Sequence, residues 1–443
     1  MRKSVKILSV MMAVLMLLSI MAFAESGYAH TEEDLNNFIP KWEGIQGDDT
    51  VISLTPGKTQ GEINFCWLSE TEKESFKISE KEDMSDSVLV EVIHKETFNS
   101  LFSNNVTVTG LEEGKTYYYS YTENGVFSQP EKIKIQPDEN FTVLYISDAQ
   151  IGRSGNETLE EVLIRDTCGW NFTVDKMAAT YPDATFLISG GDQFQSPDSL
   201  VQMKAYLSPE ELRSLPVANT IGNHDDGSTL YGDIFNNPNE VFELFKSDAG
   251  TGYFYTYGDA LFITINSENT SLTDSERVIR KAVNAHPDKK WRIVTMHRNP
   301  YSASLSDDDF SDIRLLFSSL YDCYDIDLVL AGHDHLYSRT KVMYGGKEAE
   351  EGTVYLQTSS ASGSNYDPLP EELASFIVSS FDTRVPTFTA LNFTEDTLEI
   401  STYRTDTDEV IDVFEVADND SDSTANCFTI ILSIFRTLFS MVF

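Results

Sequence analysis

The chain has 443 residues, 41% of them hydrophobic and 23% charged, as in ordinary globular proteins. Its 71 acidic side chains outnumber the 32 basic ones and give a formal net charge of -39 at pH 7. Because such a surface repels other polyanions, nucleic acids and anionic membranes are disfavoured as main partners.

The first segment, Met1–Ala24, has the pattern of a secretory signal. Basic side chains precede an apolar stretch, and Ala22-Phe23-Ala24 places a small residue on each side of a cleavage motif. The alternative is an uncleaved anchor helix, and both readings predict a secreted or extracytoplasmic protein. The polar segment Glu25–Thr50 is expected to be a lead-in to the first domain.

Residues 50–137 predict an all-β domain. Gly61–Ser69 alternates apolar and polar residues, and Val106–Thr109 ends at a glycine-containing turn before the aromatic segment Thr116–Thr122. Short strands at this spacing are typical of a β-sandwich. The turn between the last two segments resembles that of fibronectin type III-like modules. The remaining expected strands are Ser75–Ser79, Val88–Ile93 and Lys132–Ile135.

Residues 138–416 follow a different pattern, in which apolar runs alternate with helical spacing. The expected strands are Phe141–Ser147, Ala184–Ser189, Val217–Ile221, Gly252–Ile265, Arg292–Met296, Asp327–Ala331, Thr353–Gln357, Thr387–Phe393 and Thr397–Arg404. The expected helices are Glu160–Tyr181, Asp198–Leu207, Asn239–Phe245, Thr273–His286 and Asp309–Tyr321. Helices that shield mixed sheets indicate a layered α/β domain.

The C-terminal end divides into an acidic linker at residues 417–426 and an apolar tail at residues 427–443. As a helix the tail would span about 26 Å, which is short for a bilayer core. Two roles stay open for it: contact with a membrane surface, or docking onto the protein or a partner. The cysteines are scattered, and the sequence does not choose among their possible pairings. They are Cys66, Cys168, Cys323 and Cys427.

Four of the seven histidines lie in three short motifs: Gly-Asn-His-Asp at 222–225, Val-Thr-Met-His at 294–297 and Gly-His-Asp-His at 332–335. Upstream, Asp148 and Asp192 each close an apolar run. The set combines carboxylate and amide oxygens with imidazoles, which are the ligands that a pair of first-row metal ions requires.

Hydrolysis of a phosphoester needs hydroxide at neutral pH and positive charge near the phosphate oxygens. Two cations about 3.5–4 Å apart can share a bridging hydroxide and hold the phosphate. Asp192, after a Gly-Gly turn, suits the bridging position because its two oxygens can face different ions, and Asp148 offers a terminal carboxylate. The neutral donors are Asn223, His297, His333 and His335.

The motif at 222–225 also predicts acid chemistry. Asn223 can bind a metal while the next side chain, His224, points towards the substrate and protonates the leaving oxygen. Asp225 is expected to hold the His224 imidazole from behind.

On these motifs the chain resembles the calcineurin-like metallophosphoesterases, and within them the purple acid phosphatase-like branch. The resemblance implies a four-layer αββα sandwich over residues 138–416, preceded by a fibronectin type III-like β-sandwich over residues 50–137. It also implies one metal held by Asp148, Asp192 and His335. The second metal would be held by Asp192, Asn223, His297 and His333.

Two positions depart from the purple enzymes. Their metal-binding tyrosine, three residues after the bridging aspartate, is replaced here by Gln195, and the motif around Asp148 reads Asp-Ala-Gln. We therefore expect Gln150 to donate an oxygen to the first metal, or to a hydrogen bond behind it. We also expect a mixed or non-redox pair of Fe, Mn or Zn ions rather than a ferric-tyrosinate centre. Arg298 is expected to meet the substrate phosphate, or else to pair with one of the many acids.

The sequence thus predicts an exported phosphoesterase that acts on small phosphomonoesters. The first alternative is a phosphodiesterase for nucleotide or lipid headgroup substrates. An alternative from another class is a non-catalytic cell-surface binding protein with a relic metal site.

Overall fold

The computed structural model describes residues 27–48, 51–97, 99–155, 158–306, 312–382 and 384–418. The expected signal segment, nearly all of the acidic linker and the apolar tail lie outside these residues. Within the described residues, no helix combines the length and the apolar character that crossing a membrane demands. Cys66 and Cys168 are buried free thiols.

The N-terminal domain is all β, as expected, and packs two sheets around an aromatic core. One sheet has the order β1 (Ile52–Pro56), β2 (Glu62–Ser69), β6 (Phe102–Thr109) and β5 (Ile93–Glu96). The other has the order β4 (Val88–Val90), β3 (Phe76–Ser79), β7 (Thr116–Glu123) and β8 (Val126–Phe127), and β9 (Glu131–Lys134) pairs with β7. Phe65, Trp67, Phe76 and Tyr119 fill the space between them. The fibronectin type III-like assignment stays a prediction.

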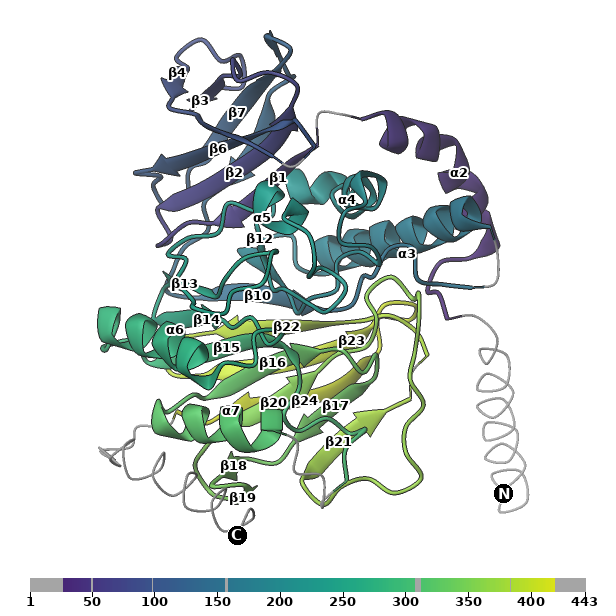
Figure 1. Cartoon of the computed structure of the whole chain (residues 1–443), viewed down its shortest axis with the longest axis vertical. Helices are drawn as coiled ribbons and strands as arrows, with labels where there is room; N and C mark the ends of the chain where they lie inside the picture. Colours follow the sequence, from purple (N-terminus) through teal and green to yellow (C-terminus); the bar gives the residue numbers. More distant parts are fainter. Residues whose placement is uncertain are drawn as a thin grey trace, which may run out of the picture.

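The second domain contains two mixed sheets that lie face to face (Figure 1). The six-stranded sheet has the order β12 (Val217–Asn219), β11 (Phe186–Ser189), β10 (Phe141–Ile146), β22 (Thr387–Phe393), β23 (Leu398–Arg404) and β24 (Val410–Val416). The seven-stranded sheet has the order β13 (Tyr253–Tyr257), β14 (Ala260–Thr264), β15 (Trp291–Arg298), β16 (Leu328–Gly332), β20 (Val354–Gln357), β17 (Tyr337–Thr340) and β21 (Ile377–Phe381). A hairpin of β18 (Met343–Tyr344) and β19 (Lys347–Glu348) stands apart.

Helices cover the outer faces of both sheets. The six-stranded sheet is covered by α2 (Glu32–Gly47), α3 (Leu159–Thr180) and α4 (Leu200–Tyr206), with η1 (Glu210–Arg213) and α5 (Leu230–Ile234) nearby. The seven-stranded sheet is covered by α6 (Leu272–Ala285) and α7 (Asp312–Cys323). One apolar cluster lies between the sheets and one lies under each helical layer. The expected αββα sandwich is therefore confirmed.

Two segments differ from the sequence prediction in this domain. Gly252–Ile265 is not one strand but a hairpin, because the chain reverses at Gly258, whose φ of 50° suits glycine. The expected helix Asn239–Phe245 is absent. There the Asp274 carboxylate accepts the backbone N–H groups of Leu244 and Phe245, so side chains replace the helical hydrogen bonds.

The lead-in segment also differs, since it contains the helix α2. Thr31 and Asp34 form a capping box at its start, and Leu35, Phe38 and Trp42 bury one face against the second domain. Its polar composition concealed this stripe. The helix packs against α3 on the outer side of the six-stranded sheet.

Candidate metal centre

The predicted ligands lie where parallel strands end. Asp148 follows β10, Asp192 follows β11 and Asn223 follows β12, while His297 and His333 lie at the ends of β15 and β16. The first three strands run parallel to each other, as do the last two. Because the carboxyl ends of parallel strands meet at one edge of a sheet, side chains from distant motifs converge there.

The first group surrounds Asp148, which is fully buried. The His335 Nε2 atom lies 3.4 Å from Asp148 Oδ1, and the backbone N–H of His333 donates to the same carboxylate at 3.1 Å. The backbone N–H of Gln150 donates to the Asp192 carbonyl at 2.8 Å. The loop after β10 is thus fixed against the loop after β11.

The second group surrounds His297, which is also fully buried. Its Nε2 atom lies 3.3 Å from Asp192 Oδ2, 3.2 Å from Asn223 Oδ1 and 3.3 Å from His333 Nδ1. Donor atoms of Asp148, Asp192 and His297 all lie within 4.8 Å of one another. The structure therefore brings together all six side chains that the sequence predicted as principal ligands.

Backbone carbonyls fix the orientation of two of the imidazoles. His297 Nδ1 lies 2.9 Å from the Gly190 carbonyl, and His335 Nδ1 lies 3.1 Å from the Asn365 carbonyl. A carbonyl only accepts, so each Nδ1 carries a proton, and each Nε2 is the atom that faces the cluster and could bind a metal once it is deprotonated. This is the arrangement that metal-binding histidines require.

The electrostatics of the cluster favour a positive charge at its centre. Burial alone would raise the pKa of Asp192, but the neighbouring His297 imidazole lowers it to about 2. Burial alone would lower the pKa of His297, but the carboxylates of Asp192 and Asp148 raise it to about 10. Burial raises the pKa of Asp148. A cation between these groups would supply the charge that the proton on His297 otherwise provides, so the donor set fits a metal.

Backbone strain is concentrated at the same place. Asp148, Gln150, Asp192, His333 and His335 all have positive φ angles, between 37° and 81°. Such conformations are uncommon for residues other than glycine and cost about 1–3 kcal/mol each. The surrounding hydrogen bonds must hold these residues in their strained conformations. Strained residues of this kind cluster at functional sites.

Gln150 and Gln195 carry unsatisfied oxygens near this cluster. Both Oε1 atoms are buried and have no hydrogen-bond partner. A buried amide oxygen without a partner costs about 1–3 kcal/mol, which a metal or its water would recover. The Gln195 side-chain amide instead places its Nε2 atom 3.2 Å from His224 Nδ1.

The structure corrects the expected role of Asp225. Its buried carboxylate does not hold the His224 imidazole but accepts the backbone N–H groups of Asp192 at 2.7 Å, Gln193 at 3.0 Å and Gly222 at 2.8 Å. The His224 Nδ1 atom lies 3.1 Å from the Gln195 carbonyl instead. Asp225 therefore fixes the turn that carries Asp192.

Arg298 lies at the edge of the second group, where it is paired with an acid, the second of its two expected partners. Glu268 accepts its guanidinium in a bidentate pair, at 2.9 and 3.0 Å, and its Nη1 atom lies 2.9 Å from His333 Nε2. The pairing with an acid is thus present. The side chain is still about one third exposed and adjoins the cluster, so it remains available to a substrate.

Sequence reasoning missed the residues that support the ligands. Asn365 orients His335, Ser360 donates to the Asp148 carbonyl at 2.9 Å, and Glu268 holds Arg298. Their positions carry no recognisable motif, and the partners lie 30, 212 and 30 residues away. Gly222 is one signal that was available, because a side chain there would overlap Asp192.

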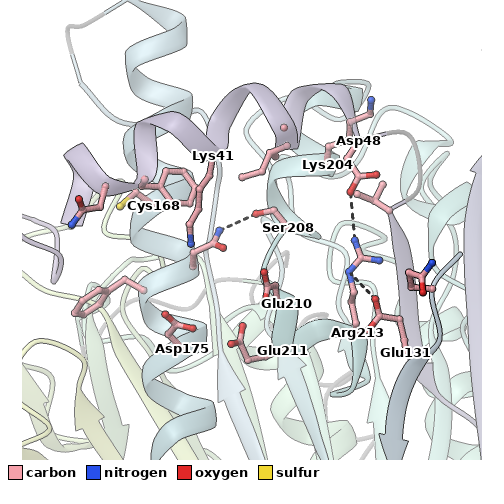
Figure 2. Close-up of a pocket in the computed structure, with 18 of the residues that line it drawn as sticks. Lys41, Asp48, Glu131, Cys168, Asp175, Lys204, Ser208, Glu210, Glu211 and Arg213 are labelled. Carbon is pink, nitrogen blue, oxygen red and sulfur yellow. Dashed lines mark hydrogen bonds and ion pairs between the residues drawn. The ribbon is translucent and has the colours of Figure 1, made fainter. Parts of the chain in front are cut away.

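A cavity of about 970 Å³ lies elsewhere, between α2, α3 and η1 (Figure 2). None of the predicted site residues lines it. Arg213 within it is already paired with Asp48 at 3.4 Å and Glu131 at 4.0 Å. The acidic residues that line it are Asp34, Asp48, Glu131, Asp175, Glu210 and Glu211, against the bases Lys41, Lys204 and Arg213. This balance disfavours an anionic ligand, so the cavity is not assigned to phosphoesters.

Comparisons with known proteins agree with the fold. Residues 141–337 match the family model described as calcineurin-like phosphoesterase. Purple acid phosphatase 23 of Arabidopsis thaliana is 22% identical over 296 residues, which are 58% of this chain and 62% of that protein. The chain thus spans less than two thirds of the length of this curated relative.

Solved structures show the same fold. Purple acid phosphatase PPD1 from yellow lupin (Lupinus luteus) seeds has a TM-score of 0.68 at 18% identity, over 83% of this chain and 74% of that one. PhoD has a TM-score of 0.52 at 11% identity, over 84% of this chain and 92% of that one. The family model supports the resemblance to the calcineurin-like phosphoesterases over residues 141–337, and the solved structures confirm the fold.

Proposed function

We propose, from the premise that residues 141–337 form a calcineurin-like phosphoesterase domain, that the chain hydrolyses small phosphomonoesters with two metal ions. One observation carries the proposal: six side chains from five separate motifs meet in one cluster of carboxylate, amide and imidazole groups. A binding protein with a relic site has no reason to keep the complete set.

Each residue has a defined task in this proposal. Asp148 and His335, with the Gln150 amide oxygen, hold one ion, and Asn223, His297 and His333 hold the other. Asp192 would serve both ions, because its Oδ2 faces His297 and donor atoms of Asp148, Asp192 and His297 lie within 4.8 Å of one another. Its Oδ1 accepts the His224 N–H at 2.8 Å, which fixes the plane of the carboxylate.

Two bound cations would polarise the phosphoryl group and lower the pKa of an attacking water. The protein itself contributes orientation and proton transfer. The Gln195 carbonyl accepts from His224 Nδ1, so the free Nε2 of His224 is the atom that can serve the leaving oxygen. Metal identity is proposed as Fe, Mn or Zn, because oxygen and imidazole donors suit all three.

Substitution of His224 separates proton transfer from metal binding. We expect His224→Ala to lower kcat by about 10²–10⁴-fold, the usual contribution of a general acid, while both metals stay bound. Steady-state kinetics and metal analysis of the same preparation check this. Loss of a metal together with activity would show that His224 supports the cluster rather than the leaving group.

Substitution of Arg298 tests its contact with substrate. We expect Arg298→Met to raise KM about tenfold, as for one lost charge-assisted hydrogen bond, with little change in kcat. Kinetics over a range of substrate concentrations give both values. An unchanged KM with a lower melting temperature would assign Arg298 to its pair with Glu268 alone.

The proposal itself is tested with a nitrophenyl phosphate as monoester and bis-nitrophenyl phosphate as diester. Protein reconstituted separately with Mn, Zn or Fe should turn over the monoester faster. Faster diester turnover would favour the phosphodiesterase alternative, and no turnover with any metal at any pH would favour the binding protein.

We further propose that the enzyme works outside the cytoplasm. The support is the signal pattern of Met1–Ala24, whose cleavage would leave a chain that begins at Glu25. Recovery of such a chain outside the cell checks the proposal, and full-length protein confined to the cytoplasm would contradict it.

A further inference from the structure

We propose that residues 27–30 are a positioning element for the metal centre, which joins two of its loops through Tyr28 and Gly27. We call these four residues the N-terminal clasp. They precede α2 and belong to none of the ligand motifs. The proposal rests on contacts among the described residues. Of the measurements that test it, only the activity depends on the proposed function.

The first arm of the clasp acts through Asp166 on α3. This buried carboxylate accepts the backbone N–H groups of Gly152 at 2.8 Å, Arg153 at 3.0 Å and Ser154 at 3.3 Å, together with the Ser154 hydroxyl. The Tyr28 hydroxyl donates to its Oδ1 at 2.9 Å. Asp166 thus fixes the conformation of the loop that directly follows Gln150.

Tyr28 is well suited to be a permanent donor. Burial, followed by the nearby Asp166 charge, raises the pKa of its hydroxyl above the ordinary value, so the proton stays on Tyr28. Its ring packs against that of His30, with centroids 4.8 Å apart, and the Arg165 guanidinium lies 5.8 Å from the ring centroid. These contacts hold the ring, and with it the hydroxyl, in one position beside α3.

The second arm acts through Tyr366 on the loop that supports the first metal position. The Tyr366 hydroxyl donates to the Gly27 carbonyl at 2.5 Å. The preceding residue, Asn365, provides the carbonyl that orients His335. The same loop contacts Asp148 through the Ser360 hydroxyl and its motif neighbour Ser147 through the Ala361 N–H, at 2.9 Å each.

Glycines permit the close approach of these segments. A Cβ atom on Gly27 would lie 2.9 Å from the Tyr366 ring, and one on Gly363 would lie 3.0 Å from the Tyr28 ring. A Cβ atom on Gly169 of α3 would overlap the Ser362 carbonyl. Each of these close contacts is possible only because a glycine stands at that position. The segments are therefore packed specifically against one another.

The two arms reach two different loops that carry or support proposed ligands of the first metal. One fixes the loop of Gln150, and the other fixes the carbonyl behind His335. Since Asp148, Gln150 and His335 all have strained φ angles, they return to relaxed conformations when their supports loosen. The clasp therefore serves the affinity and geometry of the first metal position, with no atom in the cluster itself.

The test compares Tyr28→Phe and Tyr366→Phe, alone and together, with Tyr181→Phe as a matched control. Tyr181 caps the other end of α3, and its hydroxyl shares a 2.6 Å hydrogen bond with Tyr403. Each change removes one partly buried hydroxyl and leaves the ring. The readouts are amide hydrogen exchange at residues 152–154, Zn²⁺ affinity of metal-free full chain by calorimetry, and kcat.

We expect Tyr28→Phe to speed amide exchange at residues 152–154 about tenfold. We expect Tyr28→Phe and Tyr366→Phe each to weaken Zn²⁺ binding about 10–100-fold, the usual effect of changing a residue that supports a metal ligand. Tyr181→Phe should change neither. Unchanged exchange and affinity in the clasp variants, or equal changes in the control, would overturn the proposal. If wild-type protein binds Zn²⁺ but hydrolyses no phosphoester, the proposed function fails while the clasp is still decided by exchange and affinity.

Discussion

Replacing Asp192 with asparagine is expected to abolish phosphoester hydrolysis, by about 10³-fold or more, and to leave less than two metals per chain. The reason is charge. Asp192 is buried, and although burial alone would raise the pKa of its carboxyl, the His297 imidazole beside it holds that pKa at about 2. The side chain is therefore an anion throughout the working range, and a neutral amide cannot bridge two cations in its place.

The substitution is nearly isosteric, so the fold should survive it. The amide oxygen of the substituted side chain can still accept the N–H of His224, which the Asp192 carboxylate accepts at 2.8 Å. Metal content by mass spectrometry and turnover of a nitrophenyl phosphate measure the outcome. Asp183→Asn is the control, because Asp183 is an exposed acid paired with Lys134 and should keep full activity. Two tightly bound metals in Asp192→Asn would refute the bridging role.

The ligand set could be predicted because each member lies at or shortly after the end of an apolar strand, in a short motif or at the close of an apolar run. Asp148 and Asp192 each close an apolar run, and together with the histidine motifs they supply the donor types that a metal pair requires. The alternation of apolar runs with helical spacing predicted a layered α/β domain, and the resemblance to the metallophosphoesterases implied its four αββα layers. These are local signals, and local signals are what a single sequence carries.

The supports of the site were not predictable in this way. Tyr28 meets Asp166 across 138 residues, and Ser360 meets Asp148 across 212. Contacts of this kind depend on how the loops pack after the layers have formed. The assignment of Asp225 failed for a related reason, since the imidazole next to it in sequence was assumed to be its partner.

Helical spacing was misleading in two places. Around Leu244 the spacing suggested a helix, but the Asp274 carboxylate takes the N–H groups that a helix would use. In the lead-in, a polar composition masked the buried stripe of Leu35, Phe38 and Trp42. Tertiary hydrogen bonds and packing decided both segments, and neither is visible in a short window of sequence.

Asp225→Asn is expected to weaken the metal centre rather than proton transfer alone. The carboxylate accepts three backbone N–H groups, two at Oδ2 and one at Oδ1. An asparagine has one oxygen, and its amide N–H₂ would face at least one of these donors. A buried donor left without a partner costs about 1–3 kcal/mol. This cost would destabilise the strained turn that carries Asp192.

We therefore expect Asp225→Asn to lower the melting temperature and to weaken Zn²⁺ binding about 10–100-fold. Activity should fall as well, and excess metal should partly restore it. Calorimetric titration and kinetics at rising Zn²⁺ concentration measure these effects. Asp226→Asn is the matched control, since the neighbouring carboxylate accepts the N–H of Gly227 at 2.8 Å and lies outside the cluster. If Asp225 held the imidazole of His224, as its place in the motif suggests, kcat would fall with no change in metal affinity. The three backbone contacts favour the first result, because they tie Asp225 to the bridging ligand and not to the acid.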